Sequence, residues 1–279
     1  SGSTRIYSTY IGGSSFDVPH SLVVDDNNRL ILLATTSSSN FPITTGAFST
    51  SFSGGPALTT VNSLGGLGVQ YPNGADITIT KFNPNGTGLI GSTFFGGTGT
   101  DGVGITNDLV INYGDNVRGE IETDTFGNIY VASLSSSGNL PTLSSSFKNT
   151  NSGGFDGILV KLNTNLTTLL GFTYFGGSSN DALYDLCFDN SGNIVAAGGT
   201  NSPNIGVTSG AVNSAYGGNT DVMVVSLTND LSSRRFASYY GTADYDQVYF
   251  VETDGANQVY LLGQTTHSSS NYYLFNATY

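Results

Sequence analysis

A glycine that follows an aromatic or branched residue recurs four times along this chain, and this repetition limits the possible folds more than any other feature. The four pairs are Ile11-Gly12, Phe95-Gly96, Phe175-Gly176 and Tyr240-Gly241. An aspartate lies thirteen residues after the first, third and fourth glycine, and the second unit reaches its own aspartate after a fifteen-residue delay: Asp25, Asp189, Asp254 and Asp124. A further aspartate lies twenty residues before the next glycine each time: Asp76, Asp156 and Asp221. Because Asp124, Asp189 and Asp254 are 65 residues apart, the chain is a repeat protein.

The third unit shows most clearly what one repeat contains. Residues 183–189 and 193–200 are apolar, strand-like segments joined by Asn190-Ser191-Gly192. Aspartate at the start of such a turn accepts a hydrogen bond from the backbone two residues on, and glycine supplies the positive φ. A third strand is expected at 221–228, and a turn then leads to a fourth strand that ends at the glycine. We therefore predict four antiparallel strands per unit and no helix-forming segment.

The second strand of each unit is an almost continuous apolar run that ends in a small residue. Such runs are typical of strands whose sheet is covered on both faces. We attribute the small last position to close approach of neighbouring sheets; it is occupied by Ala34, Ser133, Gly198 and Gly263. Small four-stranded sheets stacked radially are the blades of a β-propeller. The predicted fold is all-β, a β-propeller of four-stranded antiparallel blades that forms an incomplete segment of a larger ring.

Three segments carry a family resemblance: Ser-Thr-Phe-Phe-Gly-Gly (92–97), Phe-Thr-Tyr-Phe-Gly-Gly (172–177) and Asp-Asn-Ser-Gly-Asn-Ile-Val-Ala-Ala-Gly (189–198). They resemble the β-propeller repeat of bacterial exported proteins. Such repeats occur in large surface proteins of Bacteroidetes-like organisms, often beside adhesion modules and type IX secretion signals. The resemblance covers essentially the whole chain and implies an exported, extracellular or cell-surface location. It is specific for the fold and only weakly informative about activity, because the repeated residues are those that build blades.

The repeat divides the chain into five parts. Residues 1–13 match the closing strand of a preceding blade; 14–97, 98–177 and 178–241 are three blades; 242–279 begin a further blade. We expect the chain to be a segment of a longer polypeptide, whose other parts are then its first partners. The alternative is a closed ring of four blades.

Charge and hydropathy exclude two classes of partner. The net charge is −12 and there are only eight Lys and Arg residues, whereas nucleic-acid binding depends largely on cationic contacts with phosphates. No run of 18 apolar residues is present, so membrane insertion is not expected. Cys187 is the single cysteine and is interpreted as a small buried hydrophobic residue.

The loops differ in length between units, and this variation is the main indication of a binding surface. The loops between second and third strands cover residues 37–75, 136–155 and 201–220, and a further insertion covers 98–116. Binding residues often lie in variable loops on a rigid scaffold, so this face is the predicted contact for a protein or glycan. The alternative is tolerated insertion, since loop closure costs little more as loops lengthen. Tyr71, Tyr113 and Tyr216 lie in these loops and either contact the partner or fold back over their own loop.

A column of polar residues lies eight positions before each hairpin aspartate: Asp17, Asn116, Asp181 and Asp246. In a propeller these residues would lie near the mouth of the central channel. Converging carboxylates suit a hard cation such as Ca²⁺, whereas the structural alternative is that each one caps backbone N–H groups. Recurrence in every unit favours the structural role, so no metal or other cofactor is assigned.

We expect the protein to be a non-catalytic binding or scaffold module. His20 and His267 occupy non-equivalent positions, and no nucleophile elbow is present. The rival is a polysaccharide-processing enzyme with an active site at the channel mouth, which would require residues such as Asp101, Asp115 and His20 to converge. A third possibility is a structural subunit of a secretion or gliding machine.

Overall fold

The structure is a computed structural model that describes residues 3–61, 68–111 and 114–267. The described residues form an all-β architecture whose single short helix is the 3-10 turn η2 (Asp115–Val117). The first sheet contains β1 (Asp17–Val24), β2 (Leu30–Thr36), β5 (Asp76–Phe82) and β6 (Leu89–Phe95). The second contains β7 (Glu120–Thr123), β8 (Ile129–Ser135), β9 (Asp156–Leu162) and β10 (Leu169–Phe175). The third contains β11 (Asp181–Phe188), β12 (Ile194–Thr200), β13 (Asp221–Leu227) and β14 (Arg234–Tyr240).

Two smaller sheets complete the described part of the chain. A fourth sheet consists of β15 (Asp246–Thr253) and β16 (Val259–Thr265), and a small hairpin inside the first long loop consists of β3 (Leu58–Val61) and β4 (Val69–Tyr71). In the three complete sheets the strands are antiparallel and follow one another in chain order. The prediction of four-stranded antiparallel sheets is confirmed for these three.

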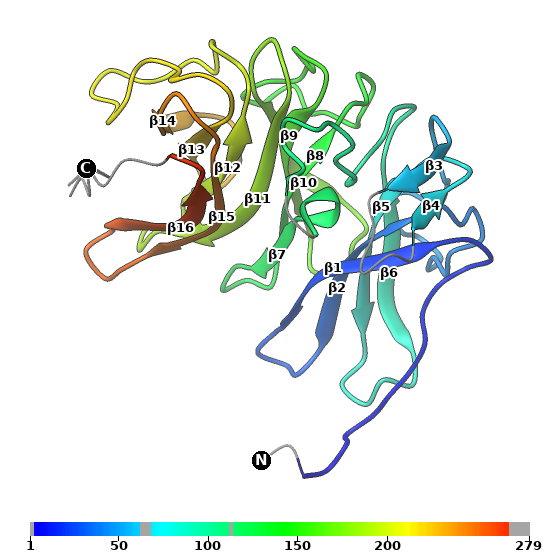
Figure 1. Ribbon diagram of the computed structural model, residues 1–279. Helices are drawn as coiled ribbons and strands as arrows, with labels where there is room; N and C mark the ends of the chain where they lie inside the picture. Colours follow the sequence, from blue (N-terminus) through cyan, green and yellow to red (C-terminus); the bar gives the residue numbers. More distant parts are fainter. Residues whose placement is uncertain (1–2, 62–67, 112–113, 268–279) are drawn as a thin grey trace.

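The sheets follow one another along an arc, like blades, from the blue first sheet to the red fourth sheet (Figure 1). The first strands of successive sheets, β1, β7, β11 and β15, contact one another along the inside of this arc. Apolar side chains fill the space between consecutive sheets, as the apolar second strands predicted. The arc in Figure 1 does not close into a ring.

The hairpin aspartates behave as predicted. Each accepts a hydrogen bond from the backbone N–H two residues later, at 2.8–3.0 Å, in all four sheets. Asp25, Asp124 and Asp189 also pair with a cation, which is Lys81 or Lys161 on the third strand or Arg235 on the fourth. An ion pair thus connects the turn between the first and second strands to the third or fourth strand of the same sheet.

The small residue predicted at the end of each second strand lies two residues before that end, and its cause is not the one predicted. A Cβ on Gly198 would lie 2.0 Å from the carbonyl oxygen of Ala182, which is on the adjacent strand of the same sheet. The β11–β12 pairing shifts register between Leu183 and Asp185, and the same irregularity occurs in the first and fourth sheets. In the first, third and fourth sheets the small residue therefore accommodates a β-bulge within the sheet rather than close approach between sheets.

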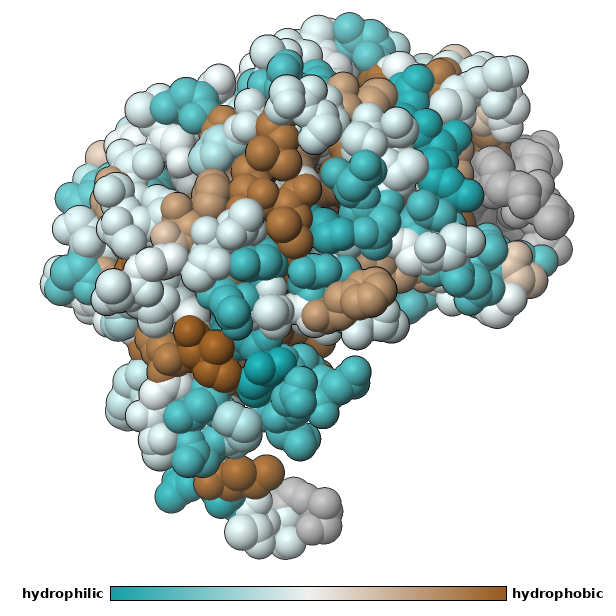
Figure 2. Space-filling model, turned by 180° about the vertical axis from the view of Figure 1, so that it is seen from behind, coloured by the Kyte–Doolittle hydropathy of each residue, from teal (hydrophilic) through white to brown (hydrophobic). Residues whose placement is uncertain are grey.

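The N-terminal segment and the second sheet differ from the regular pattern. The described residues before β1 form no strand, and Figure 2 shows this segment projecting from the body, with Ile6 88% exposed. In the second sheet, Asp101 pairs with Ser135 where a first strand would begin, and the chain then leaves the sheet before returning as β7. Residues 102–119 therefore interrupt the first strand. Among the described residues, no helix has the length and apolar character needed to cross a membrane.

Candidate functional site

Each glycine of the repeat lies against the carboxylate of an aspartate that begins a strand. A Cβ on Gly176 would lie 2.5 Å from Oδ2 of Asp181 and 2.9 Å from Oδ1 of Asp156. Asp156 begins the third strand of one sheet, and Asp181 begins the first strand of the next. Gly241 likewise meets Asp221 and Asp246, whereas the nearest atoms at Gly96 belong to Asp76 and those at Gly12 belong to Asp17. A side chain at these positions would therefore clash with a carboxylate that begins a strand.

The carboxylates that begin the first strands form a repeated hydrogen-bonding cradle. Asp181 accepts hydrogen bonds from the Gly177 N–H at 2.8 Å, from the Ser202 hydroxyl at 2.7 Å and from the Thr200 hydroxyl. Equivalent bonds to the preceding loop and to the end of the second strand surround Asp17 and Asp101. Asp246 accepts from both the N–H and the hydroxyl of Thr242.

Of the predicted column, Asp17, Asp181 and Asp246 occupy equivalent cradles, whereas Asn116 of the second unit does not. Asp101, and not Asn116, occupies the cradle of the second sheet, because the insertion follows this position instead of preceding it. Asn116 lies in η2, where its side-chain amide donates to the Gly104 carbonyl at 2.7 Å.

Burial raises the pKa of two cradle carboxyls and of two carboxyls that begin third strands. Desolvation raises the pKa of Asp181 and of Asp101 to about 6, against the opposing effect of their hydrogen bonds. Burial likewise raises the pKa of Asp76 to about 7 and of Asp221 to about 6, and in both cases the carboxylate of the next sheet adds to the shift. All the polar contacts identified for these residues cap backbone or hydroxyl groups. Within the described ranges, no group of three or more His, Cys, Asp or Glu side chains is arranged to hold a metal ion.

The interrupting segment 102–119 links the inner strands of later sheets. The carbonyl of Leu109 accepts from the Tyr184 hydroxyl and from the Gln247 amide, both at 3.2 Å. The Arg118 guanidinium lies 4.0 Å from the centre of the Tyr249 ring and pairs with Asp115 at 2.7 Å. This segment therefore braces the inside of the arc.

The residues that an enzyme would have needed have structural partners. Asp101 lies in its cradle and Asp115 pairs with Arg118. His20 Nε2 lies 3.0 Å from the Thr35 hydroxyl, which in turn lies 2.8 Å from the Tyr71 hydroxyl. Burial lowers the pKa of His20 to about 3.

The long-loop tyrosines do not form a common surface. Tyr71 is fully buried in β4, so of its two interpretations the fold-back over its own loop applies and the partner contact does not: the loop forms a hairpin that packs against the first sheet. Tyr216 is half-buried, stacks near Tyr239 with ring centres 5.9 Å apart, and donates to the Asn219 carbonyl. Tyr113 lies outside the described residues.

The loops between second and third strands return along the outer strand of their own sheet. The Thr44 N–H donates to the Ser92 carbonyl at 3.1 Å, and the Thr208 N–H donates to the Ala237 carbonyl at 3.0 Å. In the second sheet, the Tyr174 N–H donates to the Lys148 carbonyl at 3.0 Å. The loops thus cover the outer edges of the sheets, and their contacts there are architectural.

A second repeated contact joins the outer halves of adjacent sheets. The turn between the third and fourth strands carries a buried leucine with positive φ, Leu166 in the second sheet and Leu231 in the third. The Leu166 carbonyl accepts from the Phe48 N–H of the preceding sheet at 2.8 Å, and Leu231 accepts from Phe147 at 3.1 Å. We call this contact the outer junction.

A glycine on the preceding sheet leaves room for this turn, and a lysine on the same sheet donates a hydrogen bond to it. A Cβ on Gly91 would lie 2.7 Å from the Asn165 carbonyl oxygen, and one on Gly171 would lie 2.8 Å from that of Asp230. Lys81 donates to the Thr164 carbonyl at 3.2 Å while it pairs with its own hairpin aspartate at 3.0 Å. Lys161 makes the equivalent contact with Asn229.

The third sheet departs from this arrangement at every equivalent position. Phe236 stands in β14 where β6 and β10 have glycine, and Ser226 stands in β13 where the other sheets have lysine. Val212 replaces the phenylalanine of the loop and is 39% exposed. The surface that the third sheet presents to its neighbour is thus built for a different contact.

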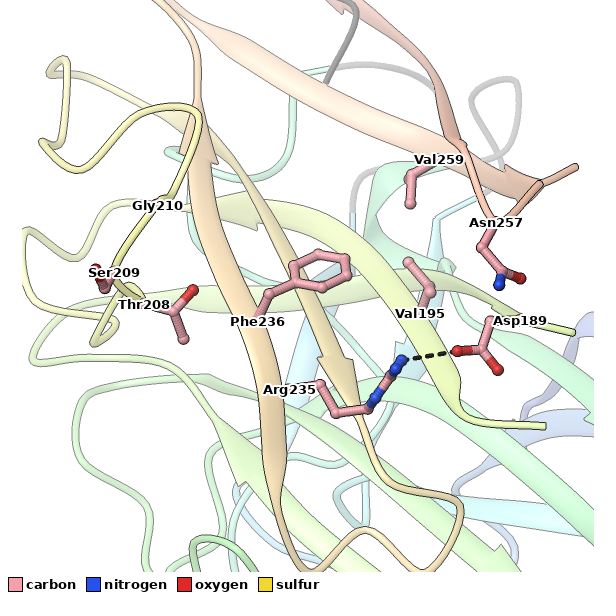
Figure 3. A pocket seen from close by; sticks show the side chains of 9 residues that line it. All are labelled: Asp189, Val195, Thr208, Ser209, Gly210, Arg235, Phe236, Asn257 and Val259. Carbon is pink, nitrogen blue, oxygen red and sulfur yellow. Dashed lines mark hydrogen bonds and ion pairs between the residues drawn. The ribbon is translucent and has the colours of Figure 1, made fainter. Parts of the chain in front are cut away.

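A cavity of about 320 Å³ lies at this departure, between the third and fourth sheets. Figure 3 shows the Phe236 ring between Thr208 and Val195, with Arg235 directed at Asp189. The ion pair measures 2.7 Å between Nη1 and Oδ2. The nine lining residues are Asp189, Val195, Thr208, Ser209, Gly210, Arg235, Phe236, Asn257 and Val259.

The fourth sheet is exposed along β16, on the face opposite to the one that Val259 and Leu261 pack against the third sheet. Among the described residues β16 pairs only with β15, whereas its equivalents β2, β8 and β12 each pair on both sides. Leu262 of β16 is 66% exposed, although the equivalent residues Leu33, Ala132 and Ala197 are completely buried. We call the cavity together with the edge and exposed face of β16 the open side; it is the candidate binding site.

No protein-family model matches the chain, and no curated protein sequence matches it significantly.

One position of the sequence indicates this site because it departs from the repeat. The fourth strands align as Leu89–Phe95, Leu169–Phe175 and Arg234–Tyr240, and their third residues are glycine, glycine and phenylalanine. A departure from a repeat at one position marks a contact that differs from the others. The departure becomes interpretable only when the residue across the junction is known.

Proposed function

We propose that this chain is a non-catalytic scaffold module of the β-propeller type and that it binds a protein partner along its open side. The observation that carries the proposal is the position of β16. It occupies a place that is central in the three complete sheets, yet its second edge has no strand partner among residues 3–61, 68–111 and 114–267.

A strand edge with an adjacent cavity favours one mode of recognition. An incoming strand pairs with the free N–H and C=O groups, and its side chains fill pockets beside the edge. The exposed apolar side chains of the fourth sheet, Phe250, Tyr260 and Leu262, add a surface that such a partner would cover. A protein is therefore favoured over a glycan, because backbone pairing supplies most of the contact.

The cradles support a scaffold role over a catalytic one. Four acidic side chains that would otherwise be candidates for chemistry each hold a chain crossing between sheets. The resemblance to exported bacterial propeller repeats supports a location outside the cell or on its surface. The scaffold role and this location are both part of the proposal.

A direct test uses a β-hairpin as the probe. Residues 76–95, which form the outer hairpin of the first sheet, would be fused to a soluble carrier protein and titrated against the full chain by biolayer interferometry. We expect binding that Leu262→Asp weakens at least tenfold, since a charge on an edge strand opposes strand addition. Phe126→Asp is the matched control, because Phe126 is 84% exposed in a distant turn. Absence of binding, or equal binding by both variants and the wild type, would refute the proposal.

A further inference from the structure

In the described part of the chain, one of the two outer junctions brings a lysine amine onto a side-chain amide. Nζ of Lys161, on β9, lies 2.5 Å from Oδ1 of Asn229, which belongs to the turn between β13 and β14 of the next sheet. At the equivalent junction between the first and second sheets, Lys81 meets the hydroxyl of Thr164 instead, at 3.1 Å. The two junctions therefore present the same amine to different chemical groups.

The amine of Lys161 lies in largely enclosed surroundings. Its side chain is 10% exposed, and that of Asp124 beside it is 8% exposed. Nζ lies 5.0 Å from the centre of the Tyr130 ring, which packs edge-on against Phe188 with ring centres 5.0 Å apart. Burial lowers the pKa of Lys161, although the carboxylates of Asp124 and Asp230 act against this shift. The neutral amine, which is the nucleophilic form, is thus easier to reach than in an exposed lysine.

The amine lies beside the carbonyl carbon of the amide. A C=O bond is about 1.23 Å long, so Nζ of Lys161 is at most about 3.7 Å from Cγ of Asn229. Reacting atoms in a near-attack arrangement are about 3–3.5 Å apart. Two further contacts hold Asn229 in this place: its side-chain Nδ2 donates to the Gly192 carbonyl at 2.7 Å, and its backbone carbonyl accepts from the Tyr130 hydroxyl at 3.2 Å.

A carboxylate is available for the proton transfers that amide exchange requires. Oδ2 of Asp124 lies 3.9 Å from Nζ of Lys161, and it accepts a hydrogen bond from the Tyr130 hydroxyl at 3.3 Å. At this distance the carboxylate reaches the amine through one water molecule or a small side-chain movement, and it can then accept and return a proton. Amine, amide and carboxylate are thus all within reach of one another.

We propose that Lys161 and Asn229 form an isopeptide bond that joins the second and third sheets covalently. The Lys161 ammonium gives one proton to Asp124, and the neutral Nζ attacks Cγ of Asn229. As the Nζ–Cγ bond forms and the Cγ–Nδ2 bond breaks, the proton on Asp124 passes to Nδ2, which leaves as ammonia. Nζ loses a second proton to Asp124, which passes it to the ammonia. The products are the isopeptide bond and ammonium, so the reaction requires no oxidant or cofactor.

The junction between the first and second sheets supplies the matched control. Asp25 lies 3.0 Å from Nζ of Lys81, so the amine and the carboxylate of the reaction are both present there. The Thr164 side chain, however, has a hydroxyl and no carbonyl carbon that the amine could attack. Lys81 should therefore remain a free amine, and Lys81→Met should leave the cross-link elsewhere unaffected.

Mass spectrometry of the purified full chain tests the proposal. The wild type and Lys81→Met should each be lighter than their sequences by one ammonia, whereas Lys161→Met should have its full mass. After chymotrypsin digestion, tandem mass spectra of the wild type should identify one peptide pair joined between Lys161 and Asn229. A wild-type chain of full mass, or ammonia lost without this peptide pair, would overturn the proposal, and both readings are independent of whether the variants fold.

The role of Asp124 has its own test. Asp124→Asn keeps a side-chain oxygen that can accept the hydrogen bonds of the turn, but it cannot carry the proton. With an unchanged circular dichroism spectrum, this variant should lose ammonia at least about tenfold more slowly than the wild type in a time course at neutral pH. Loss at the wild-type rate would show that Asp124 does not transfer the proton.

Discussion

Leucine at a left-handed position gives the outer junction a testable energetic signature. Leu231 is completely buried and has φ 60°, a conformation that costs an L-residue about 1–2 kcal/mol and that glycine adopts freely. Replacing a buried leucine by alanine costs about 2–5 kcal/mol. Leu231→Ala loses the packing and retains the backbone cost, whereas Leu231→Gly loses the packing and removes that cost.

The glycine variant should therefore be more stable than the alanine variant. We expect a difference of about 1 kcal/mol in the free energy of unfolding, because the relief of the left-handed backbone outweighs the greater flexibility of unfolded glycine. Urea unfolding followed by far-UV circular dichroism would measure it. Both variants should be less stable than the wild type, Leu231→Gly by about 2 kcal/mol.

Val225 provides the control in the same sheet. It is completely buried in β13 and its φ is not positive, so Val225→Gly should be less stable than Val225→Ala by about 1 kcal/mol. The order of glycine and alanine is thus reversed between the two sites. If Leu231→Ala proved more stable than Leu231→Gly, the left-handed conformation of Leu231 in the outer junction would be refuted.

Three further outcomes are expected. Asp181→Ala should lower the free energy of unfolding in urea by at least about 3 kcal/mol, because it leaves the Gly177 N–H and two hydroxyls without their acceptor. Asp181→Asn should lower it by less. Equal losses of stability in the two variants would contradict the cradle. Gly171→Ala should destabilise by about 1–3 kcal/mol through contact with the Asp230 carbonyl, whereas Gly138→Ala, with open space around it, should be neutral. Burial raises the folded-state pKa of Asp76 to about 7 and of Asp181 to about 6, above the unfolded value of 3.8, so the native state binds more protons between pH 4 and 7. Their contribution to stability is present below about pH 4 and is lost as pH rises through 6–7, so the urea midpoint should be higher at pH 5 than at pH 8; a midpoint that rises over this interval would contradict the assignment.

The repeat predicted the strands well because each unit carries its own local signals. The aspartates of the hairpins form the expected turns, since a side chain that bonds two residues along the chain needs no tertiary information. Cys187 is buried, as its apolar surroundings indicated. The cause assigned to Gly198 was wrong because close approach within a sheet and between sheets both require a small residue.

The errors arose where a long insertion shifts the repeat or where contacts between distant residues determine the position of a side chain. Counting back from Asp124 reached Asn116, although the spacing from Gly96 to Asp101 equals that from Gly176 to Asp181 and would have given the correct residue. Tyr71 lies in a segment rich in polar residues that nevertheless forms a hairpin, and this hairpin buries the Tyr71 side chain against the first sheet. Phe236 stands out only once the equivalent residues Gly91 and Gly171 are seen to contact the turn of the next sheet, and such contacts between sheets are not visible in the sequence.

Hydrogen–deuterium exchange of the β16 amides tests the central claim most directly. We would compare the full chain alone with the chain saturated with the carrier-fused hairpin of residues 76–95, using peptides that cover Val259–Thr265 and the bracing segment 102–119. The account predicts slower exchange in β16 when the hairpin is present and no change in segment 102–119. Unchanged exchange in β16, with protection on the inside of the arc instead, would contradict it.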